Sequence, residues 1–124
     1  MAFDHLTLAT KLFDRTVDFV GNVLEFRKLE HPGNIHVRAA WFEVAPQQAI
    51  HVLEIDDVEQ PGSDREFGRH VALRFPEDCF NRVRARIQDA GLEIIPPERP
   101  ASHERFFVRD PNGHCFEFVC RENV

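Results

Sequence analysis

The sequence predicts an α+β fold in which a β-α-β-β-β order of elements occurs twice along the chain. Three observations support this prediction. Several short segments alternate apolar and polar residues, as strands buried on one face do. Two longer segments carry apolar residues at helical spacing. Finally, short stretches of the first half have counterparts at a nearly constant distance in the second half.

The first half is expected to form a strand, a helix and three further strands. Residues 3–9 alternate, with Leu6 and Leu8 on one face and His5 on the other. Residues 12–23 carry apolar side chains at helical spacing and predict an amphipathic helix. Strands are then expected at residues 26–30, 37–44 and 49–55, separated by two turns that contain proline.

The second half repeats this order. Residues 69–75 predict a strand, after which Pro76 suits the start of a helix and Gly91 suits its end. Short strands are expected at residues 93–95, 104–109 and 114–120, the last two joined by the D-P-N-G turn at residues 110–113. We therefore place module one at about residues 1–56, a polar connecting segment at about 57–68 and module two at about 69–122.

Three short matches in the same order support a duplication of the module. Their offsets are 65, 68 and 66 residues. The matched stretches are H-L-T-L at His5 with H-V-A-L at His70, L-E-F at Leu24 with L-E-I at Leu92, and I-H-V at Ile50 with F-E-F at Phe116.

Length and composition restrict the function classes. A chain of 124 residues suits one compact domain. A net charge of −6 with scattered basic residues argues against a nucleic-acid surface. The sequence contains no apolar run of the ~20 residues that a membrane span needs and begins with no signal-peptide pattern, so we expect a cytoplasmic protein. Three cysteines without a C-x-x-C pair are expected to be reduced, partly buried thiols.

Four polar side chains are expected on the sheet faces that point away from the helices. Each precedes or separates apolar residues that pack against a helix, so alternation turns it to the opposite face. Two occupy the first strands of the modules and two the last strands. They are His5, His51, His70 and Glu117.

Imidazole nitrogens and a carboxylate form a ligand set for Fe(II), Mn(II), Ni(II), Co(II) or Zn(II). A buried carboxylate without a partner is costly, and a metal ion removes that cost. The alternative for each histidine is a hydrogen-bonded core or surface residue. The equivalent placement of all four residues in the two modules favours a metal site.

The motifs together resemble the vicinal oxygen chelate superfamily, the group of glyoxalase I, fosfomycin-resistance proteins, extradiol dioxygenases and bleomycin-resistance proteins. The resemblance covers nearly the whole chain and is most specific in D-P-N-G-H-C-F-E. It implies paired βαβββ modules whose mixed sheets form a cup, with the helices on the outer face. By position, it also implies that His5, His51, His70 and Glu117 bind a divalent metal ion.

The resemblance further implies an enzyme, an isomerase, lyase or dioxygenase, that binds adjacent oxygens of a small substrate on the metal. Small members usually form homodimers in which His5 and His51 of one chain meet His70 and Glu117 of the other. Glu117 is then a candidate base, and His51 is either a fourth ligand or a base beside the metal. The alternative is a binding protein of the bleomycin-resistance type, which sequesters a small molecule without catalysis.

Two departures from the family pattern argue against extradiol dioxygenase activity and against glyoxalase activity. The chain contains no tyrosine, a residue that extradiol dioxygenases commonly place near the metal, and it has His51 where glyoxalase I usually has a carboxylate.

Three arginines are candidates for binding an anionic substrate, with a solvated surface position as the ordinary alternative. They are Arg38, Arg74 and Arg105.

Overall fold

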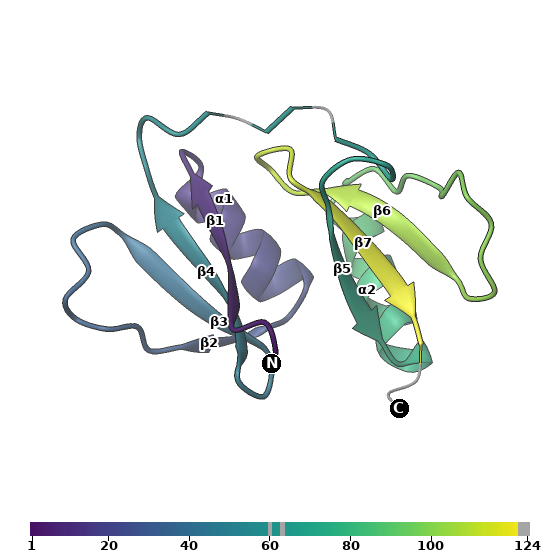
Figure 1. The fold of residues 1–124 in the computed structure, drawn as a ribbon, viewed down its shortest axis with the longest axis horizontal. Helices are drawn as coiled ribbons and strands as arrows, with labels where there is room; N and C mark the ends of the chain where they lie inside the picture. The colour runs from purple at the N-terminus through teal and green to yellow at the C-terminus, as the bar shows by residue number, and fades with distance from the viewer. Residues whose placement is uncertain (60, 63, 122–124) are drawn as a thin grey trace. The chain divides into compact units, whose positions relative to one another are not determined.

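The computed structural model describes residues 1–59, 61–62 and 64–121, and the chain divides into two compact units. Unit 1 spans Met1–Glu59 and unit 2 spans Gln60–Val124. Each contains one mixed sheet with helical segments on one face, which confirms the predicted α+β fold (Figure 1). Positions 60 and 63 of the predicted connecting segment, and position 122 at the end of predicted module two, lie outside the described residues.

Unit 1 contains a four-stranded sheet in the order β1-β4-β3-β2, in which β1 and β4 run parallel and the other neighbours antiparallel. A short α-helix and a π-helical turn connect β1 to β2. The elements are β1 (His5–Thr10), α1 (Phe13–Asp18), η1 (Phe19–Val23), β2 (Arg27–Leu29), β3 (Ala39–Ala45) and β4 (Gln48–Glu54).

The predicted helix at residues 12–23 is divided in two, because its last turn is a π-helix. The Leu24 N–H accordingly donates to the Phe19 carbonyl, five residues earlier, at 2.9 Å. Gly21 lies in this turn against the Phe42 ring of β3. A Cβ at Gly21 would lie 3.1 Å from that ring, so glycine allows the turn to approach the sheet closely.

One face of the unit 1 sheet packs against α1 and η1. Thr10 of β1 reaches Thr16 of α1 with 3.1 Å between the hydroxyl oxygens, which fixes the helix-facing side of that strand. On β3 and β4 the buried residues Phe42 and Ile50 face the same way and pair in register. Residues between these positions therefore point to the sheet face away from the helix, which we call the distal face.

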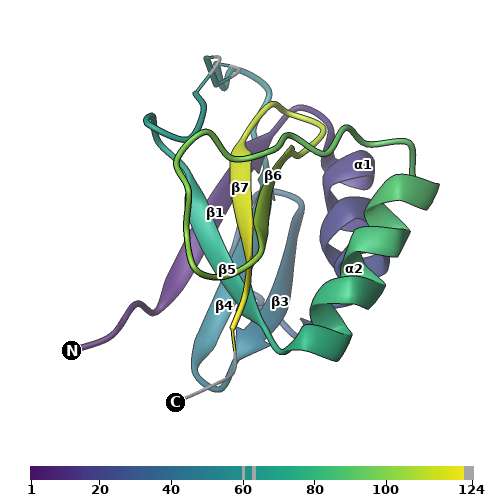
Figure 2. The same ribbon diagram turned by 90° about the vertical axis from the view of Figure 1, so that its right-hand side faces the viewer.

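Unit 2 contains a three-stranded sheet in the order β5-β7-β6, with β5 and β7 parallel and β6 antiparallel to β7. The long helix α2 lies along one face of this sheet (Figure 2). The elements are β5 (Val71–Phe75), α2 (Glu77–Asp89), β6 (Arg105–Arg109) and β7 (Cys115–Cys120).

Aromatic residues fill the space between this sheet and α2. Phe106 of β6 stacks on Phe118 of β7, with ring centroids 5.1 Å apart, and Phe80 of α2 lies 5.2 Å from Phe106. Phe118 therefore faces α2, and alternation puts Phe116, two residues earlier on β7, on the same face; their exposed fractions are 0% and 1%. Glu117 between them therefore lies on the distal face of β7, as predicted.

The predicted strand at residues 93–95 is wrong. Ile95 alone forms an isolated antiparallel bridge with Phe107, through two backbone hydrogen bonds of 2.8 and 2.9 Å. The neighbouring residues follow Gly91, whose φ of +75° directs the chain out of α2. Two prolines after Ile95 then supply no backbone N–H groups to extend a ladder. Among the described residues, no helix combines the length and the apolar character that a membrane span requires.

Candidate metal centre

His70 and Glu117 form a close pair on the distal face of unit 2. His70 directly precedes β5, and its Nε2 lies 3.1 Å from Oε1 of Glu117. The Glu117 side chain is 12% exposed and that of His70 is 22% exposed. The rings of Phe107 and His70 are nearly perpendicular, with centroids 5.3 Å apart, so Phe107 limits the positions that the His70 ring can take.

The hydrogen bonds of His70 show what this pair requires. Its Nδ1 lies 3.2 Å from the Gly68 carbonyl oxygen, which can only accept, so Nδ1 carries the proton. In the neutral ring, Nε2 then presents a lone pair to the Glu117 carboxylate, which is itself an acceptor. Two acceptors at 3.1 Å need a proton or a cation between them.

The same pair has the donor chemistry and spacing of two neighbouring metal ligands. Ligand atoms that are each about 2.1 Å from one ion, at about a right angle to one another, lie about 3 Å apart. A backbone carbonyl that orients the imidazole through its other nitrogen is also common among metal-ligating histidines. His70 and Glu117 therefore fit a divalent metal ion.

Arg105 of β6 also binds Glu117 and is fully enclosed. Its Nη1 donates to Oε2 of Glu117 at 3.2 Å, its Nη2 donates to Oε2 of Glu66 at 3.1 Å, and its side chain is only 1% exposed. The solvated-surface alternative is therefore wrong for Arg105. It holds for Arg38 and Arg74, which are exposed.

Ion pairing determines the protonation states of Arg105 and Glu66. Burial alone would lower the pKa of Arg105, but hydrogen bonds to Glu66 and Glu117 raise it above its usual value. Burial alone would raise the pKa of Glu66, but the Glu98 N–H, Arg105 and the Arg99 N–H together hold it below its usual value. Both groups are therefore charged at neutral pH.

A pocket of about 420 Å³ lies on the part of unit 2 next to Glu117. Phe107 and Cys115 line it, and both neighbour Glu117, the first across the β6–β7 ladder and the second two residues along β7. Burial raises the pKa of the Cys115 thiol, which opposes a nucleophilic role. Arg65 and Arg109 line the same pocket. This volume is in the range of sites for small molecules, ~300–1,000 Å³.

His5 and His51 form a second pair, on the distal face of unit 1. Their rings stack with centroids 3.9 Å apart and planes 14° from parallel. On its other side, His51 stacks on Trp41 at 3.8 Å and 9°, because these two residues are register partners on β4 and β3. Burial first, and then the neighbouring His5, lower the pKa of His51, so its ring is neutral at pH 7.

The stack limits how these two histidines can bind metal. A metal ion lies in the plane of the imidazole that binds it, and two nearly parallel rings whose centroids are 3.9 Å apart do not direct their nitrogens at one ion. In this arrangement only one of the two rings can ligate a given ion. His5 has the better support, because its Nδ1 lies 2.7 Å from the Asp4 carboxylate and its Nε2 is then the metal-binding nitrogen.

The structure thus brings the four predicted residues together as two pairs, His5 with His51 in unit 1 and His70 with Glu117 in unit 2. Within the ranges that the structure describes, no group of three or more His, Cys, Asp or Glu side chains lies close enough to hold a metal ion.

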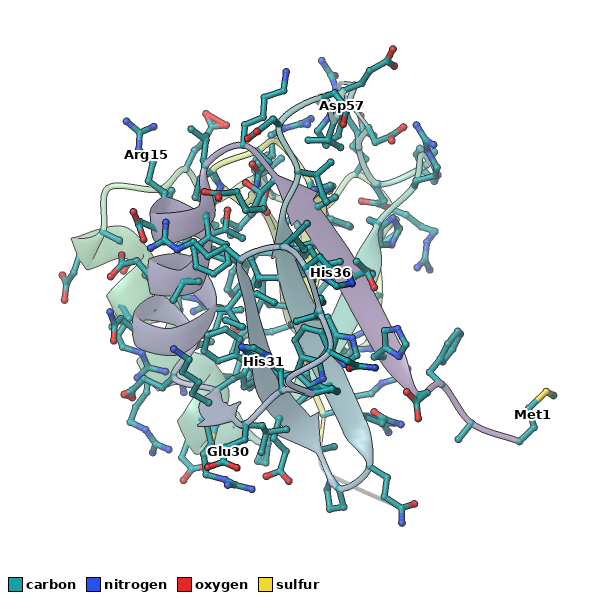
Figure 3. All side chains as sticks on the ribbon, turned by 90° about the vertical axis from the view of Figure 1, so that its left-hand side faces the viewer. Met1, Arg15, Glu30, His31, His36 and Asp57 are labelled. Atoms are coloured by element: carbon teal, nitrogen blue, oxygen red, sulfur yellow. The ribbon has the colours of Figure 1, made fainter. Side chains whose placement is uncertain are left out.

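The remaining histidines lie apart from these pairs. His31 and His36 are exposed on the connection between β2 and β3 (Figure 3). His103 and His114 are partly buried. Glu66 is the residue of this centre that the sequence did not reveal, because it lies in a polar segment without periodicity, 39 positions before Arg105.

Comparison with known proteins supports the same assignment of the fold. The family model of the Glyoxalase/Bleomycin resistance protein/Dioxygenase superfamily matches residues 2–118. A protein of the glyoxalase family from Bacillus anthracis has a TM-score of 0.80 at 20% identity over 98% of this chain and 96% of that chain. A glyoxalase/dioxygenase from Nostoc punctiforme has a TM-score of 0.78 at 18% identity over 98% and 92%.

A variant of the fosfomycin resistance protein FosX from Listeria monocytogenes is also similar. Its structure, in complex with Mn(II) and 1S,2S-dihydroxypropylphosphonic acid, has a TM-score of 0.76 at 21% identity over 98% of this chain and 92% of that chain. At these identities the likeness to all three solved structures concerns the fold.

Proposed function

Because the chain belongs to the Glyoxalase/Bleomycin resistance protein/Dioxygenase superfamily, we propose that it is a divalent-metal-dependent enzyme that acts on a small molecule bound through adjacent oxygens. The observation that carries the proposal is the contact of 3.1 Å between Nε2 of His70 and Oε1 of the largely buried Glu117. The Mn(II) in the FosX structure supports a divalent ion as the cation between these two atoms.

His5, His70 and Glu117 are the proposed metal ligands. The Asp4 carboxylate and the Gly68 carbonyl orient the two imidazoles so that each presents Nε2. When bound, the ion supplies Lewis-acid chemistry and orients the substrate oxygens. The pocket beside Phe107 and Cys115 receives the remainder of the substrate.

His51 is the proposed general base. Its lowered pKa keeps the imidazole neutral at pH 7, so it can accept a proton from the substrate. The flat faces of Trp41 and His5 hold the ring between them, which fixes the plane in which its nitrogens point. Glu117 would be the second candidate for this step, because its carboxylate can also accept a proton.

A metal-free binding protein is the second candidate function, and one observation favours it. Arg105 already offsets the charge of Glu117, and a proton on Nε2 of His70 would complete the pairing without a metal ion. The protein would then hold a small molecule in the pocket without catalysis, as a sequestering protein does.

Metal analysis separates the two candidates. We expect protein purified without chelator, or reconstituted with Fe(II), Mn(II), Co(II), Ni(II) or Zn(II), to hold about one ion per chain. Glu117→Gln and His70→Ala should lose it, since each removes a ligand. His36→Ala is the matched control, because His36 is exposed and should leave the content unchanged. A wild-type protein that binds none of the five ions is the binding protein instead.

We also propose a homodimer in which His5 and His51 of one chain complete the site of His70 and Glu117 in the other. Mixing His5→Ala chains with Glu117→Ala chains should then restore about a quarter of the metal sites, since half of the dimers are mixed and each mixed dimer holds one intact site. No restored site after chain exchange, measured as bound metal, would show that each site belongs to one chain.

A further inference from the structure

Arg105 joins Glu117 to a carboxylate from a different part of the chain. The guanidinium lies between Oε2 of Glu117, at 3.2 Å, and Oε2 of Glu66, at 3.1 Å. The side chains of Arg105, Glu66 and Glu117 are 1%, 6% and 12% exposed. Interactions between charged groups are strong at such burial, so their geometry is well fixed.

The two oxygens of Glu117 have different partners. Arg105 binds Oε2, whereas Oε1 faces Nε2 of His70. A carboxylate held by one oxygen cannot rotate about its last bond without losing that hydrogen bond. Arg105 therefore sets which oxygen faces His70 and in which direction its lone pairs point.

Glu66 holds Arg105 in turn. Besides its ion pair with Arg105, Glu66 accepts hydrogen bonds from the backbone N–H groups of Glu98, at 2.7 Å, and Arg99, at 3.0 Å. The Arg99 carbonyl also accepts from Nη2 of Arg105. The guanidinium is thus clamped by the segment before β5 and by the segment before β6.

A guanidinium group holds Glu66 and Glu117 together better than the ammonium group of a lysine would. Two of its nitrogens bind two different carboxylates at once, whereas the ammonium of lysine acts as a compact point charge on a flexible stem. If Arg105 acted only through its charge, its removal would strengthen metal binding, because a cation near Glu117 repels a metal ion. If Arg105 positions Glu117, its removal should weaken metal binding. The sign of the effect of an Arg105 substitution on metal affinity therefore distinguishes the two roles.

We propose that Arg105 is a positioning residue that holds Glu117 with one oxygen toward His70 and the metal, and that Glu66 holds Arg105 in place. This inference rests on the proposed metal-dependent function. It assigns a role to two residues that are not themselves proposed metal ligands, Glu66 in the connecting segment and Arg105 at the start of β6.

The test is a calorimetric titration of metal-free protein with Mn(II) and with Zn(II). Arg105→Gln should weaken binding by about 10–100-fold, the usual effect of removing a group that orients a ligand. Arg105→Lys should recover part of the affinity, and Glu66→Gln should weaken binding in the same direction as Arg105→Gln. Arg82→Gln is the matched control, because Arg82 pairs with Asp78 at the exposed surface of α2.

A double variant separates positioning from a merely structural role. Glu66→Gln together with Arg105→Gln removes one negative and one positive charge, so it restores the charge balance of the buried cluster. A structural role predicts that this variant regains both stability and metal affinity, whereas positioning predicts that the affinity stays low while stability recovers. Glu66→Gln and Arg105→Lys keep the test informative where Arg105→Gln does not fold.

Besides regained metal affinity in the double variant, three outcomes overturn the inference. Unchanged affinity in Arg105→Gln shows that Glu117 needs no support, and tighter binding shows that the charge of Arg105 outweighs positioning. Both leave the proposed function intact, because the wild-type protein still binds metal. A wild-type protein that binds none of Fe(II), Mn(II), Co(II), Ni(II) and Zn(II) overturns the proposed function, and the inference about Arg105 falls with it.

Discussion

Units 1 and 2 place their candidate residues at equivalent positions but surround them with different partners. Thr7 pairs with His51 on neighbouring parallel strands of unit 1, as Ala72 pairs with Glu117 in unit 2. Trp41 is the antiparallel partner of His51, as Phe107 is of Glu117. His51 is held by flat ring contacts, whereas Glu117 is held by charged hydrogen bonds.

One pair of equivalent positions accounts for much of this difference. Arg105 opens β6 and pairs with Val119, and the corresponding position in unit 1 is Ala39, which opens β3 and pairs with Leu53. An alanine offers no charge to a carboxylate, so position 51 suits a neutral ring that stacks on Trp41. The repeated backbone thus fixes where a side chain points, and the neighbours on the next strand decide its chemistry.

The largest expected effect is on the free energy of unfolding, through the ion pairs of unit 2. Arg105→Gln leaves Glu66 and Glu117 buried without their cation, so we expect a loss of about 3 kcal/mol in a urea titration of metal-free protein. Arg38→Gln in unit 1 removes a half-exposed arginine that pairs with Asp14 and should cost about 0–1 kcal/mol. Equal losses for the two variants would mean that burial does not distinguish these ion pairs.

A smaller effect should appear in the dependence of stability on pH. The pKa of Glu66 is lower in the folded chain than its usual value of 4.5, so the folded state favours the charged carboxylate. The stability that this group contributes is complete above pH 4.5 and is lost as the pH falls through the lower folded-state value. The difference in unfolding free energy between wild type and Glu66→Gln should therefore be constant near neutral pH and shrink below 4.5.

The matched control for this titration is Glu104→Gln. Glu104 pairs with Arg84 at 2.7 Å, but its side chain is 67% exposed, so its contribution should be small at every pH. A difference between wild type and Glu66→Gln that grows on acidification would contradict the charged state assigned to Glu66.

The order of elements could be predicted from the sequence because alternation and helical spacing are local signals. They also placed Glu117 on the correct face, since Phe116 and Phe118 have to pack against α2. The strand at residues 93–95 could not be placed in this way, because three residues carry too little periodicity. The π-helical turn depends on the contact between Gly21 and Phe42, which lie on different elements.

For the candidate site, the sequence predicts only the sheet face on which each residue lies, because alternation along a single strand determines that face. Alternation selects the face for His5 and His51, but their stacking on Trp41 depends on the register between β3 and β4. The partners of Glu117 depend still more on tertiary structure. Glu66 reaches Arg105 from 39 positions away, and no local pattern marks either residue as buried.

The smallest expected effect is spectroscopic and reports on unit 1. Trp41 is the only tryptophan, and its ring stacks on His51 at 3.8 Å. A protonated imidazole in contact quenches indole fluorescence, so emission should fall on acidification. The pKa of His51 is lowered by burial and then by His5, so the midpoint should lie below 6.5. The stability linked to neutral His51 is present above 6.5 and lost as the pH falls through the folded-state value.

His51→Gln should remove this fluorescence transition in metal-free protein, whereas His36→Gln should leave it unchanged because His36 is exposed on the connection between β2 and β3. His31→Gln is the second control, since its ring is tilted and lies farther from Trp41, at 5.5 Å. A midpoint above 6.5 would mean that His51 is held as a cation. It would then resemble the charged partners of Glu117 in unit 2, and the contrast between a neutral stack and a charged cluster would fail.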